Sequence, residues 1–219
     1  MKIKTFKIIL VLIVSAVSIQ SFAQNDQLFK LWPDSILAEA NSAKNAFYMS
    51  EEEKVVVYYT NLVRINPALF SKTFLIEYLD QNDLKKDKEI KELIKELETR
   101  SQMKILQPSE TLTTAARNHA KDMGETGRTG HTTSDGKSFK DRMMAVANDY
   151  EGVNENCNYG IDKGVEAFMD LLIDRNVPNY GHRKNILDPE MKFIGVAIEP
   201  HKRMRYNCVQ DFAGRKIDR

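Results

Sequence analysis

The sequence lacks an internal repeat, and no linker rich in proline, glycine or serine divides it. Its 219 residues are therefore expected to form one domain with a sizeable core, or at most two small ones. The sequence also lacks HExxH, GxSxG and CxxC motifs and a glycine-rich phosphate loop. No local motif therefore names a reaction, and any chemical site must be assembled from residues that are far apart in the chain.

The first 23 residues have the pattern of a secretory signal peptide. Three lysines precede an uncharged, mostly apolar run from Ile8 to about Ile19, and the small residues of "SFA" follow at a suitable cleavage point. The run is too short to cross a membrane comfortably. We therefore expect residues 1–23 to be removed and the mature chain to begin at Gln24. The protein is then secreted or periplasmic, with no membrane span.

Charge of one sign is not in large excess. The whole sequence has 32 basic and 31 acidic residues, and the expected signal peptide contains three of the basic ones and none of the acidic ones. The mature chain then has a net charge of about −2. Such a balance argues against nucleic acid or an anionic membrane as the main partner.

Helical periodicity fills much of the mature chain. Apolar residues recur at spacings of three and four in four segments: residues 51–66, where three acids suit a helix N-terminus, 83–100, 109–124 and 162–174. A further helix is expected over about residues 138–147, because a turn precedes a capping box formed by Ser138 and Asp141. Ser109 is expected to cap the third helix and Gly124 to end it. The residues that these patterns place in the core are Val55, Tyr59, Leu62, Leu112, Ala116, Val165, Phe168 and Ile194.

Strand signals are short and lie near the C-terminus. "VNENCNYG" at 153–160 is the first, and "FIGVAIEP" at 193–200 and "RYNCVQDFAG" at 205–214 alternate well enough to form an antiparallel pair. Helices followed by a closing hairpin predict an α+β fold in which helices pack on a small antiparallel sheet.

Two histidines and a carboxylate are candidates for a shared site. His131 and His182 each follow a glycine, and Glu155 lies between them in the sequence. Two imidazoles and one carboxylate can hold an open zinc site, or can act as an acid/base pair with an orienting partner. They can also be buried polar residues that only bond to one another. His119, on an apolar helix face, is expected to be a hydrogen-bonded core residue rather than a ligand.

Taken together, these stretches resemble the bacterial branch of the CAP superfamily. This secreted domain is shared by cysteine-rich secretory proteins, antigen 5 and pathogenesis-related 1 proteins. The resemblance runs from "NSAKNAFYMSEEEK" through "GHTTSDGKSFKDRM" and "GHRKNILDPEMKFIGVAIEP" to "CVQDFAG", in the order of the family. It implies an α-β-α sandwich with a three-stranded antiparallel sheet between helical layers. Residues 51–219 would form the CAP domain, with residues 24–50 packed on it.

The resemblance also implies a cleft lined by two histidines and two acids. His131 and His182 match the two histidines. Glu155 matches the acid of a Gly-Glu-Asn motif, which here lacks its glycine. Asp170 and Asp174 are candidates for the second acid, although neither is in the register of the family's motif. The implied metal ligands are His131, Glu155 and His182, and this donor set favours zinc.

The two cysteines have two possible roles. Export to an oxidising compartment predicts one disulfide between Cys157, in the first expected strand, and Cys208, in the last. Alternatively, Cys157 shares a strand face with Glu155, two residues before it, and is a fourth metal ligand or a reactive thiol.

Three functions remain in competition. The first is an extracytoplasmic binding module whose His/Glu-lined cleft takes an extracellular protein, a glycan or a small apolar ligand. The second is a divalent-metal-dependent hydrolase that uses the same cleft, with metal-bound water attacking an ester or amide. The third is a structural or cell-surface protein whose cleft has no activity. No single reaction belongs to the whole family, so we expect a binding module rather than an enzyme.

Overall fold

The computed structural model describes residues 28–144, 146 and 150–216. The expected signal peptide, with its cleavage point before Gln24, lies outside the described residues. Within the described part of the chain, no helix combines the length and apolar character needed to cross a membrane.

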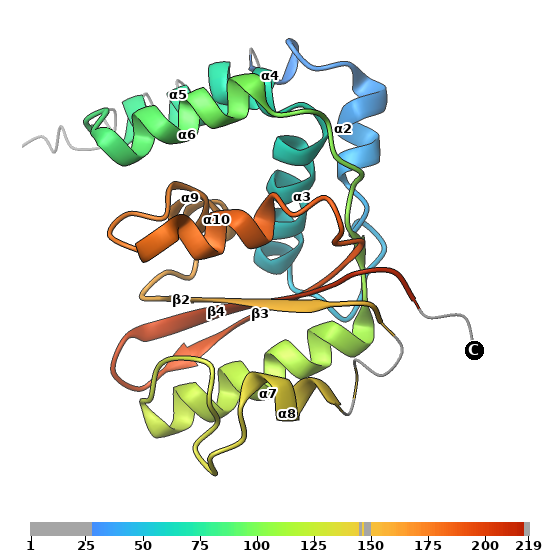
Figure 1. Ribbon diagram of the computed structural model, residues 1–219, viewed down its shortest axis with the longest axis vertical. Coiled ribbons are helices and arrows are strands. Elements are labelled where there is room, and N and C mark those ends of the chain that lie inside the picture. Colours follow the sequence, from blue (N-terminus) through green and yellow to red (C-terminus); the bar gives the residue numbers. More distant parts are fainter. Residues whose placement is uncertain (1–27, 145, 147–149, 217–219) are drawn as a thin grey trace, which may run out of the picture.

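A four-stranded sheet forms the middle layer (Figure 1). Its strand order is β1-β3-β4-β2, in which β1 is Gln107–Pro108, β2 is Val153–Tyr159, β3 is Phe193–His201 and β4 is Arg205–Ala213. Strands β2, β3 and β4 pair antiparallel, and the expected β3–β4 hairpin is confirmed. The expectation of three strands was wrong. The fourth strand, β1, pairs parallel to β3. It was missed because its two residues are too few to produce a periodic pattern in the sequence.

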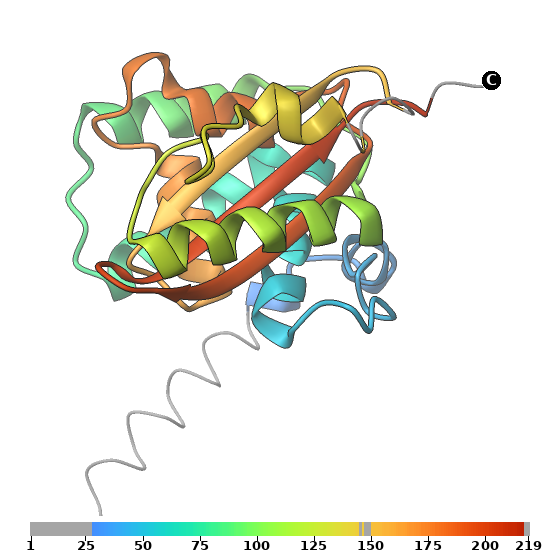
Figure 2. The same ribbon diagram turned by 90° about the horizontal axis from the view of Figure 1, so that it is seen from below.

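Helices cover both faces of the sheet, which confirms the expected α+β class. On one face lie α7 (Glu110–Thr126) and α8 (Phe139–Met144). Seen from below, α7 runs along β3 and β4 while α8 lies over β2 (Figure 2). The other face carries α3 (Glu51–Ile65), α9 (Gly164–Ile173), the short 3-10 turn η2 (Pro178–Tyr180) and α10 (Gly181–Ile186).

A further group of helices packs outside α3 and α9. These helices are α2 (Asp34–Ala40), α4 (Pro67–Lys72), α5 (Phe74–Gln81) and α6 (Lys88–Thr99). The segment before α3 is attached by specific contacts, because the Trp32 indole donates to Thr73 Oγ1 at 3.2 Å and Asn61 Nδ2 donates to the carbonyl oxygen of Ala40 at 3.1 Å.

One buried arginine connects distant parts of the chain. Arg64, at the end of α3, is 0% exposed. Its guanidinium donates to four backbone carbonyl oxygens, those of Lys104 (3.0 Å), Ile186 (2.8 Å), Asp188 (2.8 Å) and Met191 (3.1 Å). The turn that leads from α10 into β3 is therefore held against α3.

The helix α7 extends beyond its expected end. Ser109 caps it as expected, since its side chain accepts from the Leu112 N–H. The helix ends at Gly127, whose φ is 70°, and not at Gly124. A Cβ atom at position 124 would lie 2.1 Å from the carbonyl oxygen of Pro200. Gly124 is thus explained by the close approach of α7 to β3 rather than by helix termination.

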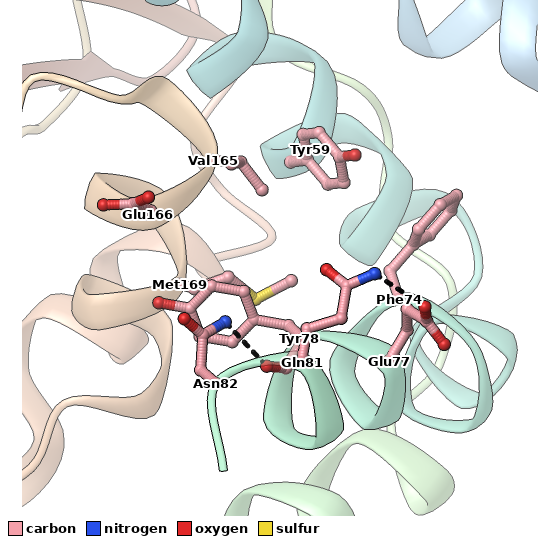
Figure 3. A pocket seen from close by; sticks show the side chains of 9 residues that line it. All are labelled: Tyr59, Phe74, Glu77, Tyr78, Gln81, Asn82, Val165, Glu166 and Met169. Atoms are coloured by element: carbon pink, nitrogen blue, oxygen red, sulfur yellow. Dashed lines mark hydrogen bonds between the residues drawn. The ribbon is translucent and has the colours of Figure 1, made fainter. Parts of the chain in front are cut away.

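The expected core is confirmed at five of eight positions. Leu62, Leu112, Ala116, Phe168 and Ile194 are buried. Val55, Tyr59 and Val165 are only partly buried, so that part of the expectation was wrong. Tyr59 and Val165 line a groove of about 400 Å³ between α3, α5 and α9 (Figure 3). The neighbouring helices therefore do not cover the whole apolar face of α3. Sequence periodicity shows which residues are on that face, but not how much of it is buried.

Gly195 of β3 marks the closest approach of α7 to the sheet. A Cβ atom there would lie 2.2 Å from the backbone carbon of Leu112 and the backbone nitrogen of Thr113. We expect Gly195→Ala to lower the free energy of unfolding, measured in urea, by about 2–3 kcal/mol because helix and strand must separate. Gly181→Ala is the matched control. Its φ is −61° and no atom lies within 4 Å of the added carbon, so its effect should stay within about 1 kcal/mol. Equal stabilities of the two variants would contradict this packing.

Candidate functional site

Strand alternation in β2 divides the expected site into two halves. Cys157 packs on the α7 side with Ala116 and Ala120. Asn156 points to the other side, where its Nδ2 donates to the carbonyl oxygen of His182 at 3.2 Å. Because successive side chains of a strand alternate, Glu155 also faces the α7 side. The loop carrying His131 meets Glu155 there, whereas α10 carries His182 on the opposite face.

On the α7 side, Glu155 is held by two basic groups. Its Oε1 lies 2.8 Å from His131 Nδ1, and Arg142 Nη2 donates to both carboxylate oxygens at 2.8 and 2.7 Å. Burial alone would raise the pKa of Glu155, but the His131 hydrogen bond and the Arg142 charge outweigh it and lower the pKa. Glu155 is therefore ionised and already neutralised by protein groups.

Two further side chains border Glu155. His119 is 1% exposed and its Nε2 lies 2.9 Å from the carbonyl oxygen of Gly130, as expected for a hydrogen-bonded core histidine. Cys157 Sγ lies 3.7 Å from His131 Nδ1. Burial, followed by the charge of Glu155, raises the Cys157 pKa well above its usual value. The sulfur is therefore a neutral thiol and not an activated nucleophile.

Asp211 is the residue that sequence reasoning missed most clearly. It lies opposite Glu155 in the β2–β4 register and is 0% exposed. Burial, and next the charge of Glu155, raises the Asp211 pKa well above its usual range. The carboxyl group is therefore neutral, and its proton can be shared with Glu155. The available signal was alternation in "VQDFA", which places Asp211 on the same strand face as the apolar Val209 and Ala213. Arg142 was missed because only the capping residues of its helix were considered.

On the opposite face, His182 pairs with Asp174. His182 Nδ1 lies 2.7 Å from Asp174 Oδ1, and the backbone N–H groups of His182 and Arg183 donate to Asp174 Oδ2 at 2.9 and 3.2 Å. Asp174 has a φ of 57°, in the left-handed region, where it ends α9. This turn aims its carboxylate at the first residues of α10 and fixes the His182 ring.

His182 borders an open cleft of about 250 Å³ along the edge of β2. Asp170 lies at the exposed rim, where its Oδ2 accepts from Asn158 Nδ2 at 2.6 Å. The lining residues are Cys157, Asn158, Tyr159, Asp170, Leu171, Asp174, Arg175, Val177 and His182. Of the expected site residues, the structure therefore gathers His182, Asp170 and Asp174 here, and leaves His131 with Glu155.

The expected ligand set of His131, Glu155 and His182 does not fit a divalent ion as these side chains stand. His182 is bonded to Asp174 on the other side of β2, and Arg142 bonds to both Glu155 oxygens and would have to leave before any ion could bind there. Among the residues that the structure describes, the group of three potential ligands whose atoms all lie within 4.8 Å consists of His119, Glu155 and Cys157.

The expected disulfide was wrong. Cys157 lies opposite Val209 in the β2–β4 register, and Cys208 lies opposite Asn158. The two cysteines are thus one register step apart and point to opposite faces. Cys157 faces α7, whereas Cys208 belongs to the core under α3 and α9, and both are free.

Alkylation provides a direct check on the free thiols. Protein denatured without reductant should take up two iodoacetamide groups per chain, and reduction beforehand should not change the number. Both thiols are buried, so the folded protein should react far more slowly. Mass spectrometry reads the result, and zero uptake without reductant would contradict the paired register.

Solved structures that are similar to this chain include three bacterial proteins of low identity. An extracellular protein containing an SCP domain from Bacillus anthracis is 16% identical, with a TM-score of 0.47 over 75% of this chain and 41% of that one. An outer surface protein from Borrelia burgdorferi is 21% identical, with a TM-score of 0.45 over 60% of this chain and 96% of that one. A cysteine-rich secretory protein from Staphylococcus aureus is 11% identical, with a TM-score of 0.43 over 76% of this chain and 40% of that one.

The chain thus spans about two fifths of the Bacillus and Staphylococcus proteins. No curated protein matches its sequence. The family model for the cysteine-rich secretory protein family, CAP, matches residues 57–212, which include both His/carboxylate pairs and all of β2 and β3. The chain therefore belongs to the cysteine-rich secretory protein (CAP) family.

Proposed function

We propose that this protein is an extracytoplasmic binding module whose ligand occupies the cleft beside His182. The observation that carries the proposal is the arrangement of the His182 ring. Its Nδ1 is tied to the buried carboxylate of Asp174, and the side chain is 23% exposed where it borders the cleft. A ring held in this way has Nε2 available as a fixed hydrogen-bonding group for a ligand.

The chemistry of the cleft favours a hydroxyl-rich ligand, such as one sugar unit of a glycan. Asp170 and Arg175 carry opposite charges, and Asn158 has a buried Oδ1 with no hydrogen-bond partner among the described residues. The Tyr159 ring does not contribute, because it packs on the α7 side, where its hydroxyl accepts from the Gly130 N–H at 2.7 Å. Convergent polar groups of this kind are suited to the hydroxyl groups of a sugar ring. The same charges argue against a purely apolar ligand, since their burial would be costly.

Hydrolysis is less well supported than binding. A metal-dependent hydrolase needs ligands that converge with an open position, and the expected three do not converge. A cysteine nucleophile needs a lowered pKa, and that of Cys157 is raised by burial. The signal-peptide pattern of residues 1–23 supports a location outside the cytoplasm.

A titration of the mature protein with neutral saccharides tests the proposal. We expect N,N′-diacetylchitobiose or maltose to shift the NMR resonances of the His182 ring, and His182→Ala to weaken binding at least tenfold. His131→Ala is the matched control because this histidine lies on the other side of β2, and it should bind as the native protein does. If no saccharide moved the His182 resonances, or if both variants lost binding equally, the proposal would fail.

A further inference from the structure

Three buried side chains on the α7 side of the sheet lie close enough to share one ion. The ligand atoms of His119, Glu155 and Cys157 are all within 4.8 Å of one another, and the three residues are 1%, 6% and 8% exposed. We propose that they form a buried transition-metal site, and that Arg142 of α8 must leave Glu155 before the ion enters. None of these ligands contacts the His182 ring, so the site does not depend on the proposed function.

His119 has the hydrogen bonding of a metal-binding histidine. The carbonyl oxygen of Gly130 can only accept, so Nε2 of His119 carries the proton and Nδ1 has the lone pair. That Nδ1 is buried and has no hydrogen-bond partner among the described residues. A histidine that binds a metal through one ring nitrogen usually donates the N–H of its other ring nitrogen to a carbonyl or carboxylate oxygen, as His119 does here. An ion would satisfy an acceptor that is otherwise costly to bury.

Glu155 and Cys157 complete a donor set of nitrogen, oxygen and sulfur. Zinc binds these donors at about 2.0–2.3 Å in a tetrahedron, which places ligand atoms about 3.4–3.8 Å apart. Separations of no more than 4.8 Å therefore require a closure of about 1.4 Å or less. On binding, the S–H bond of Cys157 breaks, its proton passes to solvent and the sulfur bonds to the ion. One thiolate and one carboxylate then balance the two positive charges.

The Arg142 guanidinium lies against the Glu155 carboxylate, where the proposed metal ion would bind. Its Nη2 donates to both oxygens of Glu155, while its Nε and Nη1 are buried and have no hydrogen-bond partner in the part of the chain that the structure describes. A guanidinium and a divalent ion would repel each other at this distance, so they compete for Glu155. The arginine comes from α8, a six-residue helix, and can be displaced without breaking the sheet.

Cobalt(II) is the probe, because thiolate coordination produces a near-ultraviolet charge-transfer band. The mature protein is kept reduced and titrated with a cobalt salt. We expect Arg142→Met to bind cobalt at least tenfold more tightly than the native protein, with that band. Adding Cys157→Ser to Arg142→Met should abolish the band, and adding His119→Asn should weaken binding at least tenfold. His182→Ala, as control, should change neither.

If Arg142→Met does not fold, the cobalt titration of the native protein tests the proposal instead. At a large excess of cobalt, the native chain should show a weaker band at the same wavelength, lost in Cys157→Ser. Absence of a thiolate band from the native protein, together with absence from any folded Arg142→Met, would overturn the proposal. A band that survived His119→Asn at unchanged affinity would also overturn it.

Discussion

Replacing Arg64 with methionine is expected to lower the free energy of unfolding by about 3–5 kcal/mol, because a buried charged group with four hydrogen bonds is lost. The methionine keeps much of the side-chain volume but removes every donor. Four carbonyl oxygens, in residues 104 and 186–191, would lose the guanidinium donor, although that of Asp188 also accepts from the Met191 N–H at 3.3 Å, and buried acceptors without partners are strongly destabilising. Burial lowers the pKa of Arg64 to about 10, so the group is still charged at neutral pH.

Urea unfolding, followed by circular dichroism, measures this difference. Arg215→Met is the matched control, because that side chain is 71% exposed and its partner among the described residues is Glu151, and the change should cost less than about 1 kcal/mol. A loss at Arg64 as small as that at Arg215 would show that the carbonyl groups find water or other donors.

Truncating Phe168 to alanine is expected to have an effect of similar size, about 3–5 kcal/mol. The side chain is 0% exposed, and its ring centroid lies 6.1 Å from that of Tyr59 and 5.9 Å from that of Phe70. The change removes apolar contacts and leaves a cavity between α3, α4 and α9, which the backbone of three helices cannot easily fill.

Phe47 supplies the comparison for Phe168. It is 90% exposed, so Phe47→Ala removes the same atoms without creating a cavity and should change stability by less than about 0.5 kcal/mol. The two variants are measured under identical conditions by urea unfolding. A loss below about 1 kcal/mol for Phe168→Ala would show that the core beneath α9 collapses around the missing ring.

The local features of the fold could be predicted from the sequence because neighbours in the chain produce them. Ser50 and Glu53 form a capping box at the start of α3, where three acids suggested a helix N-terminus. Ser138 and Asp141 bond reciprocally at the start of α8, as expected. The β3–β4 hairpin followed from alternation alone. In each case the signal and the structure lie within one short stretch of the chain, the longest of which is 193–213.

The candidate site was only partly predictable because it depends on strand register and on which basic group reaches a buried acid. Cys157 and Cys208 are one register step apart and therefore point to opposite faces of the sheet. The sequences of the two strands do not reveal this register. Likewise, Glu155 and His182 were each found from the sequence. The partners that decide their chemistry, Arg142 and Asp174, come from segments whose placement is set by long-range packing.

The strand order has a consequence for the time course of folding. The central strands β3 and β4 follow β1 and β2 in the chain, whereas β1 and β2 lie at the edges and do not pair with each other. Neither edge strand has a pairing partner until residues 193–213 are present. Every ladder therefore waits for residues 193–213, and the pairing of β1 and β2 with these strands spans long sequence separations, which makes it slow. If the protein is exported as its N-terminus predicts, this delay keeps the sheet from forming while the chain still has to thread through a translocation channel.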